Sequence, residues 1–135
     1  MSGTGEAEGE TRYQRGLRRL RELDGQDGID WARDVRAISP DFERYIVENA
    51  FGVVWSRNGL TDREREIATI AALTAMANVK AELVSHIAQA EKIGLTRDEI
   101  LEIILHMTVY AGFPAALEAL DAAREVFSRS EGFAR

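Results

Sequence analysis

Apolar residues recur every three or four positions along most of this chain of 135 residues, and this spacing predicts an all-α fold. No segment alternates apolar and polar residues as a half-buried strand would. The first ten residues are polar, acidic and rich in glycine, so we expect a disordered tail over 1–10 and one domain over 11–135. The periodicity predicts about six helices in that domain.

The first part of the domain shows two helical segments. One is predicted over Arg12–Leu23 and should stop at Asp24–Asp30, where two glycines occur. The next should begin at Ser39, which can cap a helix, with a proline following in the first turn. It should end near Trp55, before an Asn-Gly turn. The residues that we expect this second helix to bury are Phe42, Tyr45, Ile46, Ala50, Val53 and Val54.

The second part of the domain contains two capping boxes, Thr61–Glu64 and Thr96–Glu99, each of which predicts the start of a helix. The run Ile67–Ala77 is apolar on nearly all sides, so its helix should lie at the centre of the fold. Asn78 and the segment 112–114 should interrupt the helices. Three later stripes should face the core: Leu83, Ile87 and Ala90; Ile100, Ile103, Ile104 and Met107; and Leu117, Leu120, Ala123 and Phe127.

Composition narrows the possible chemistry. The chain has no cysteine, which excludes disulfides, thiolate metal sites and cysteine nucleophiles, and its two histidines argue against a His-rich zinc site. A formal charge of -6 argues against nucleic acid as a partner, and we interpret the basic run Arg12–Arg21 as a solvated helix face. No window approaches the roughly 20 apolar residues of a membrane span. Because the N-terminal stretch also lacks the pattern of a signal peptide, we expect a soluble, cytoplasmic protein.

Two Glu-His pairs are candidates for chemistry. Glu82 and His86 lie four residues apart and therefore on one helix face, where the carboxylate could orient the imidazole as a general acid or base. An ordinary solvated pair has the same spacing and stays an alternative. Glu102 and His106 repeat the spacing on the face opposite their helix's apolar stripe and should be exposed. Di-metal bundles use Glu-x-x-His instead, so we predict no metal site.

Two arginines and two aromatic residues complete the candidates. Arg57 and Arg65 flank the Asn-Gly turn, and their planar guanidinium groups suit a substrate carboxylate. A local ion pair between Arg65 and Asp62 is the alternative. Trp55 and Tyr110 stand at predicted helix ends beside glycines, where pockets often form, although ordinary packing would also explain them.

Five short segments of the sequence form a motif set whose order and spacing can be compared with known families: RYQRGL at 12–17, AFGVVWSRNGL at 50–60, ELVSH at 82–86, GLT at 94–96 and YAGFPAA at 110–116. Together they resemble the carboxymuconolactone decarboxylase family, within the alkylhydroperoxidase-like superfamily, from about residue 12 to residue 127. The resemblance implies all-α subunits in a ring-like homo-oligomer, commonly a trimer or hexamer. It also implies cofactor-free decarboxylation of a small lactone of the 4-carboxymuconolactone type, from aromatic catabolism. The peroxidase branch depends on a Cys-x-x-Cys pair, which this chain lacks.

The resemblance implies that His86, with its imidazole oriented by Glu82, would deliver a proton to the substrate. Arg65 or Arg57 would hold a carboxylate of the substrate or the growing oxyanion. Trp55 and Tyr110 would border the pocket.

Two departures from the family pattern keep other functions open. Val53 stands where the family commonly has glutamate, and Leu117 stands where it commonly has asparagine. Both changes would suit a less polar substrate. One alternative is therefore a cofactor-free tailoring enzyme (a cyclase, isomerase or decarboxylase) of a secondary metabolite. Another is a non-catalytic binding or assembly protein that keeps the fold for its oligomer.

Overall fold

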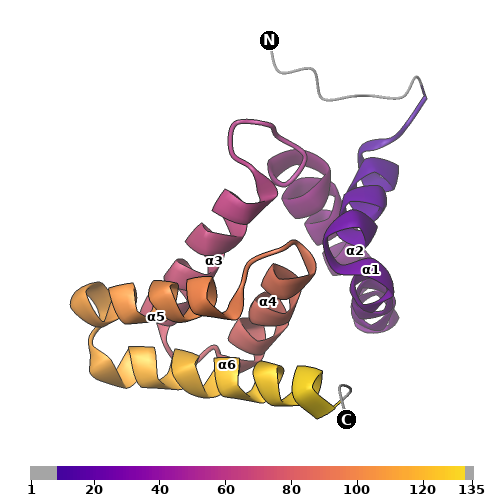
Figure 1. Ribbon diagram of the computed structural model, residues 1–135. Helices are drawn as coiled ribbons and strands as arrows, with labels where there is room; N and C mark the ends of the chain where they lie inside the picture. The colour runs from indigo at the N-terminus through magenta and orange to yellow at the C-terminus, as the bar shows by residue number, and fades with distance from the viewer. Residues whose placement is uncertain (1–8, 133–135) are drawn as a thin grey trace. The chain divides into compact units, whose positions relative to one another are not determined.

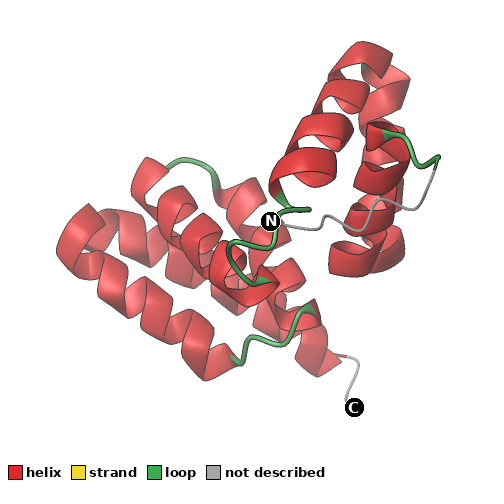
Figure 2. Cartoon of the chain, turned by 90° about the horizontal axis from the view of Figure 1, so that it is seen from above, coloured by secondary structure: helices red, strands yellow, loops and turns green. Residues whose placement is uncertain are grey.

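The computed structural model describes residues 9–132, and every regular element in that range is helical, which confirms the predicted all-α fold (Figures 1 and 2). The elements are α1 (Arg12–Ile38), α2 (Pro40–Ile46), the π-helix η1 (Val47–Val54), α3 (Asp62–Met76), α4 (Lys80–Lys92), α5 (Arg97–Ala111) and α6 (Phe113–Gly132). Most of the predicted tail, residues 1–8, lies outside the described residues. The chain divides into two compact units, the first ending at Asp62 and the second beginning at Arg63.

The first unit contains a kinked helix where we predicted a break. Only Gly25 leaves helical geometry, with φ 64° and ψ -147°, and α1 continues beyond it to Ile38. Gly28 lies within the helix and is buried. A β-carbon there would stand 2.9 Å from Leu20 Cδ1, so this glycine permits close packing rather than ending the helix. The predicted break is therefore confirmed at Gly25, but it does not extend over the whole of 24–30.

Two glycines allow α1 and η1 to approach each other at backbone distance. A β-carbon on Gly16 would stand 2.1 Å from the Val47 carbonyl oxygen, and one on Gly52 would stand 2.5 Å from the Arg12 carbonyl oxygen. Neither position can hold a side chain unless the helices move apart. These contacts form the centre of the first unit.

The second predicted helix begins where expected but buries a different face. Ser39 Oγ accepts a hydrogen bond from the Phe42 backbone N–H at 3.3 Å. The fully buried positions are Glu43, Val47, Phe51 and Gly52, whereas four members of the predicted stripe are exposed: Phe42, Tyr45, Val53 and Val54. The predicted stripe contained apolar residues only, whereas the buried face of this helix includes the carboxylate of Glu43. This carboxylate accepts a hydrogen bond from Tyr13 Oη at 2.7 Å, and this contact allows its burial.

The second unit has a core made by α4, α5 and α6, with one side chain of α3. Figure 1 shows α5 and α6 lying side by side after the turn at Gly112, whose φ is 86°. Both hydrogen bonds of the Thr96–Glu99 capping box are present, as predicted. The expected inward faces of α4 and α5 are confirmed at Leu83, Ile87, Ala90, Ile100, Ile104 and Met107. The core face of α6 consists mainly of small residues: Ala116, Ala119, Ala122, Ala123 and Val126.

Two predictions for this unit are wrong. The helix over Ile67–Ala77 is not central, because Ile67 and Met76 are exposed. Leu117 and Leu120 of α6 are also exposed, since the neighbouring alanines make the close contact with the core. The buried residues of α3 are Glu66, Ile70 and Thr74, one on each successive turn.

Candidate active site

The turn between α3 and α4 positions the two helices that carry the candidate site. Ala77 and Asn78 both have φ of 56°, in the left-handed region that residues other than glycine rarely adopt. The Asn78 N–H donates to Glu118 Oε2 of α6 at 3.1 Å. This contact helps to hold the turn, and the break predicted at Asn78 is confirmed.

Across these two helices, His86 and Gln89 of α4 meet Glu66 of α3. His86 Nδ1 lies 2.9 Å from Glu66 Oε1, and Gln89 Nε2 donates to Glu66 Oε2 at 2.7 Å. The Glu66 side chain is 0% exposed, whereas that of His86 is 22% exposed. Each carboxylate oxygen thus has a partner, and the imidazole reaches the surface of the unit.

This arrangement is suited to moving a proton. A buried carboxylate hydrogen-bonded to Nδ1 fixes the orientation of the imidazole ring and stabilises its protonated form. Nε2 of His86 is then the nitrogen that could exchange a proton with a bound molecule. The His86 side chain is therefore a candidate general acid or base, a role that stays a prediction.

The carboxylate at its Nδ1 is not the predicted one. Glu82 lies exposed on the first turn of α4, and Glu66 takes the orienting position that we expected Glu82 to hold. Sequence reasoning missed Glu66 because it compared residues within one helix only. A signal was nevertheless present: Glu66 precedes Ile70 by four residues and so shares its inward face.

The other candidates of the second unit lie in different surroundings. Arg65 is half-buried on α3, next to the buried glutamate in sequence. Asp62, the alternative partner that we considered for it, accepts a hydrogen bond from Arg19 Nη2 at 2.7 Å within the first unit. Tyr110 is 72% exposed near the end of α5. Its ring lies 5.0 Å from that of His106, which is exposed as predicted.

Trp55 and Arg57 come together in the first unit. They line a shallow cavity of about 400 Å³ that follows the end of η1 and also includes Arg19. Arg19 Nε donates to the Trp55 carbonyl oxygen at 3.1 Å, and Arg15 Nε donates to the Gly52 carbonyl oxygen at 2.8 Å. These two arginines therefore bind the end of the π-helix, where carbonyl groups favour a cation, and do not belong to a purely solvated face.

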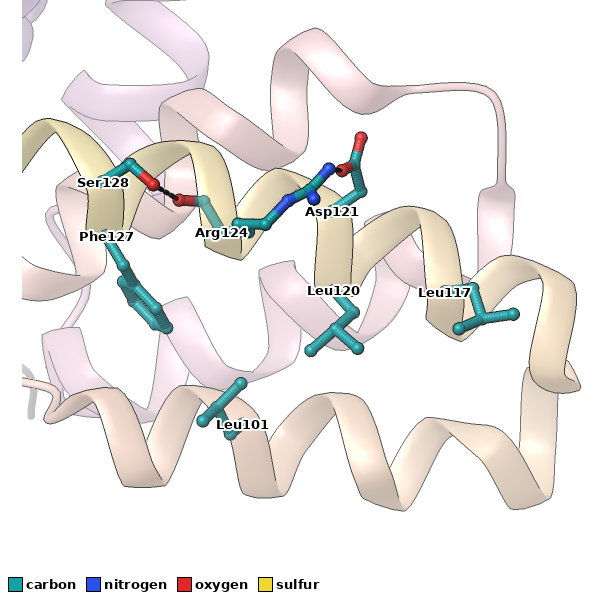
Figure 3. Close-up of a pocket in the computed structure, with 7 residues that line it drawn as sticks. All are labelled: Leu101, Leu117, Leu120, Asp121, Arg124, Phe127 and Ser128. Carbon is teal, nitrogen blue, oxygen red and sulfur yellow. Dashed lines mark hydrogen bonds and ion pairs between the residues drawn. The ribbon is translucent and has the colours of Figure 1, made fainter.

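A larger, mainly apolar cavity of about 570 Å³ lies between α5 and α6. Figure 3 shows Leu101 of α5 and Leu120 of α6 pointing towards each other across it, with the hydrogen-bonded pair Arg124 and Asp121 on the α6 side. Leu117, the position at which the family commonly has asparagine, also lines this cavity.

Within residues 9–129, no group of three or more histidine, aspartate and glutamate side chains is arranged to hold a metal ion. Of the helices described, none combines the length and the apolar character that crossing a membrane requires.

Comparison with known proteins adds independent findings. Residues 40–125 match the model of the carboxymuconolactone decarboxylase family. A 4-carboxymuconolactone decarboxylase of Acinetobacter baylyi is 38% identical over 119 residues, covering 87% of this chain and 88% of its own. The nitrosuccinic acid decarboxylase npaB of Metarhizium robertsii is 29% identical over 109 residues, covering 80% and 76%. An uncharacterized 15.0 kDa protein from the nqo9-nqo10 intergenic region of Paracoccus denitrificans is 32% identical over 102 residues, covering 73% and 76%. The chain therefore belongs to the carboxymuconolactone decarboxylase family.

Proposed function

We propose that this protein is a cofactor-independent decarboxylase of a small carboxylated lactone of the 4-carboxymuconolactone type, or of a related keto acid, with His86 as its general acid. The observation that carries this proposal is the contact of His86 with the buried carboxylate of Glu66. Two similar proteins named as decarboxylases support the reaction class.

The reaction needs a group that takes up the electron pair of the broken C–C bond, and a proton donor. When the carboxylate departs as CO₂, the electron pair of the broken C–C bond moves through the double bond into the lactone carbonyl, which gives a dienolate. Transfer of a proton from His86 Nε2 to a carbon of the dienolate then restores the carbonyl, so the substrate has exchanged CO₂ for one hydrogen overall. The imidazole regains its proton from solvent, and Glu66 stabilises the protonated ring throughout.

The substrate itself supplies the electron sink in this scheme, so the protein has only to bind, orient and protonate. By resemblance to the family, Arg65 or Arg57 would bind a remaining carboxylate or the growing oxyanion. Trp55 and Tyr110 would border the bound molecule. His86 is accessible enough for direct contact with a small substrate.

A second candidate function is a tailoring reaction, again without a cofactor, on a less polar metabolite. The apolar residues Val53 and Leu117, and the leucines that line the cavity between α5 and α6, favour it. The relative named for nitrosuccinic acid supports a family whose members differ in substrate.

We also propose that the chain forms a ring-like homo-oligomer, a trimer or hexamer. The support is that α5 and α6 expose several apolar side chains, and exposed apolar surface is typical of interfaces between subunits. These side chains are Leu101, Leu105, Val109, Tyr110, Phe113, Leu117 and Leu120.

Decarboxylation can be tested with purified protein and 4-carboxymuconolactone, by following CO₂ release and ultraviolet absorbance. His86→Gln should lower kcat by about 100-fold or more, because the proton donor is removed. Glu66→Gln should also lower kcat, and its effect should be larger than that of Glu82→Gln. The matched control is His106→Gln, which changes the chain's other histidine and should retain wild-type turnover.

Two results would contradict the proposal. Unchanged turnover in His86→Gln would exclude its role as the acid. If the wild-type protein at high concentration does not convert the lactone but decarboxylates a less polar β-keto acid, the second candidate is favoured instead.

A further inference from the structure

We infer that Gln89 is a positioning residue for the proposed reaction: its amide keeps Glu66 ionised and thereby holds the proton of neutral His86 on Nδ1. This inference rests on the function proposed above and adds a residue that neither the sequence pattern nor the family resemblance singled out.

The geometry fixes the direction of the hydrogen bond. Gln89 follows His86 by three residues on α4, so both side chains reach the same carboxylate of α3. In a glutamine side chain only the amide nitrogen carries hydrogens, so Gln89 Nε2 donates and Glu66 Oε2 accepts. The amide is almost fully buried, with Gln89 5% exposed.

A shared proton between a carboxylate and an imidazole can lie on either partner. Burial alone would favour the neutral acid, because a side chain with no exposure loses the hydration of its charge. A hydrogen bond donated to the other carboxylate oxygen favours the ionised form. Gln89 provides that bond, and the proton therefore stays on Nδ1 of His86.

The location of this proton determines how His86 can act. With Glu66 ionised, the protonated ring is an imidazolium, which donates a proton readily from Nε2. With Glu66 protonated, the ring would be a neutral imidazole that already carries its hydrogen on Nε2, and this form is a much weaker acid. Gln89 should accordingly affect the proton-transfer step more than substrate binding.

The buried face of α4 shows that packing does not require a polar side chain here. The other fully buried positions, Leu83, Ile87 and Ala90, are all apolar. An apolar side chain of similar length at position 89 would fill the same space without donating to Glu66. The substitution Gln89→Met is therefore close to a removal of the hydrogen bond alone.

The test is the tautomer of His86 in a long-range proton–nitrogen correlation spectrum of nitrogen-labelled protein. With only two histidines in the chain, His106 serves as an internal reference. In the wild type, neutral His86 should carry its hydrogen on Nδ1, facing ionised Glu66. In Gln89→Met, Glu66 should take up a proton from solvent, and the neutral ring should then carry its hydrogen on Nε2. Turnover of the lactone should fall about tenfold in this variant, with KM changed by less than about twofold.

Gln26→Met is the matched control, because Gln26 Nε2 also donates to a carboxylate, Asp30 Oδ1, at 2.9 Å, but on an exposed face of α1. It should change neither the tautomer nor kcat. The inference is overturned if neutral His86 of the wild type carries its hydrogen on Nε2, a result that needs no variant to fold. It is equally overturned if folded Gln89→Met keeps the wild-type tautomer. Because the spectrum requires no substrate, a wild-type protein that fails to convert the lactone would count against the proposed function alone.

Discussion

Buried glutamates in this protein each contact donor groups from other helices. Glu66 has His86 and Gln89, and Glu43 has the hydroxyl of Tyr13. The contact between Tyr13 and Glu43 also affects Tyr13. Burial and the hydrogen bond to Glu43 raise the pKa of the Tyr13 hydroxyl above its ordinary value. At this scale, a charged side chain in the interior is stable because specific donors replace its water.

A carboxylate on the surface gives a prediction for pH dependence. Hydrogen bonds from the Thr96 backbone N–H, at 3.0 Å, and from the Arg63 guanidinium hold the pKa of Glu99 below its ordinary value. A lowered pKa in the folded state stabilises the protein above the unfolded-state pKa, and this contribution is lost as pH falls through the folded pKa. Wild type should therefore be more stable than Glu99→Gln at neutral pH, and the difference should shrink in acid.

Urea denaturation at a series of pH values measures this difference. Glu99→Ala also removes the capping-box hydrogen bond that the Glu99 side chain accepts from the Thr96 N–H, so it should be less stable than wild type at every pH. A difference between wild type and Glu99→Gln that stays constant from neutral to acidic pH would show that the charge has no such role.

The candidate site can be predicted in part from residue types, but the hydrogen-bond partners of its side chains cannot. His86 stands out in the sequence because histidines are scarce and a glutamate precedes it by one turn. The choice of Glu66 over Glu82 depends on how α3 packs on α4, which spacing within a single helix does not contain. Gln89 gives no sequence signal, since a polar residue at a buried position is recognised only after the packing is known.

At the scale of elements, helix caps were predicted more reliably than buried faces. Ser39 and the Thr96–Glu99 box begin helices as expected, because capping depends on hydrogen bonds within a few residues. The helix containing Ile67–Ala77 was misplaced because its apolar residues occur on all sides, so the pattern alone does not indicate which side packs inward. The change from α2 to the π-helix η1 was also not predicted.

The close contact of α1 with η1 yields a stability prediction. Gly16→Ala should lower the free energy of unfolding by about 1–3 kcal/mol, because the new methyl group would collide with the Val47 carbonyl and separate the helices. Urea denaturation followed by circular dichroism measures the change. Gly59→Ala is the control, since a β-carbon there meets nothing within 4 Å, and it should differ from wild type by less than about 0.5 kcal/mol. Equal stability of Gly16→Ala and wild type would contradict this account of the contact.

For the whole molecule, helix content and family could be predicted, whereas the division into two units could not. Composition and periodicity predict one helical domain over 11–135, and the contacts within the chain form two compact units that divide after Asp62. Packing between helices decides such a division, and a hydrophobic pattern does not specify which helices pack together. Many apolar residues predicted as core are instead exposed, and this is the expected pattern for a chain that buries them against another copy.

The proposed oligomer can be tested by substitutions among the exposed apolar residues of α5 and α6. Leu105→Glu and Leu117→Glu, at positions 61% and 60% exposed, should each reduce the sedimenting species to a monomer, because a charge would be buried at the interface. Gln26→Lys, which places a charge at an exposed polar position of the first unit, should leave the oligomer intact. A wild-type protein that sediments as a monomer at micromolar concentration would contradict the proposal.

The turn at Ala77 and Asn78 has a consequence for recombination between members of the family. It separates Glu66 on one helix from His86 and Gln89 on the next, so a crossover at the turn would join a carboxylate from one parent to an imidazole and an amide from another. A chimera would keep the contacts of Glu66 with His86 and Gln89 in this geometry only if residues 66–89 all came from this chain. Crossover points for such chimeras should therefore be placed before residue 66 or after residue 89.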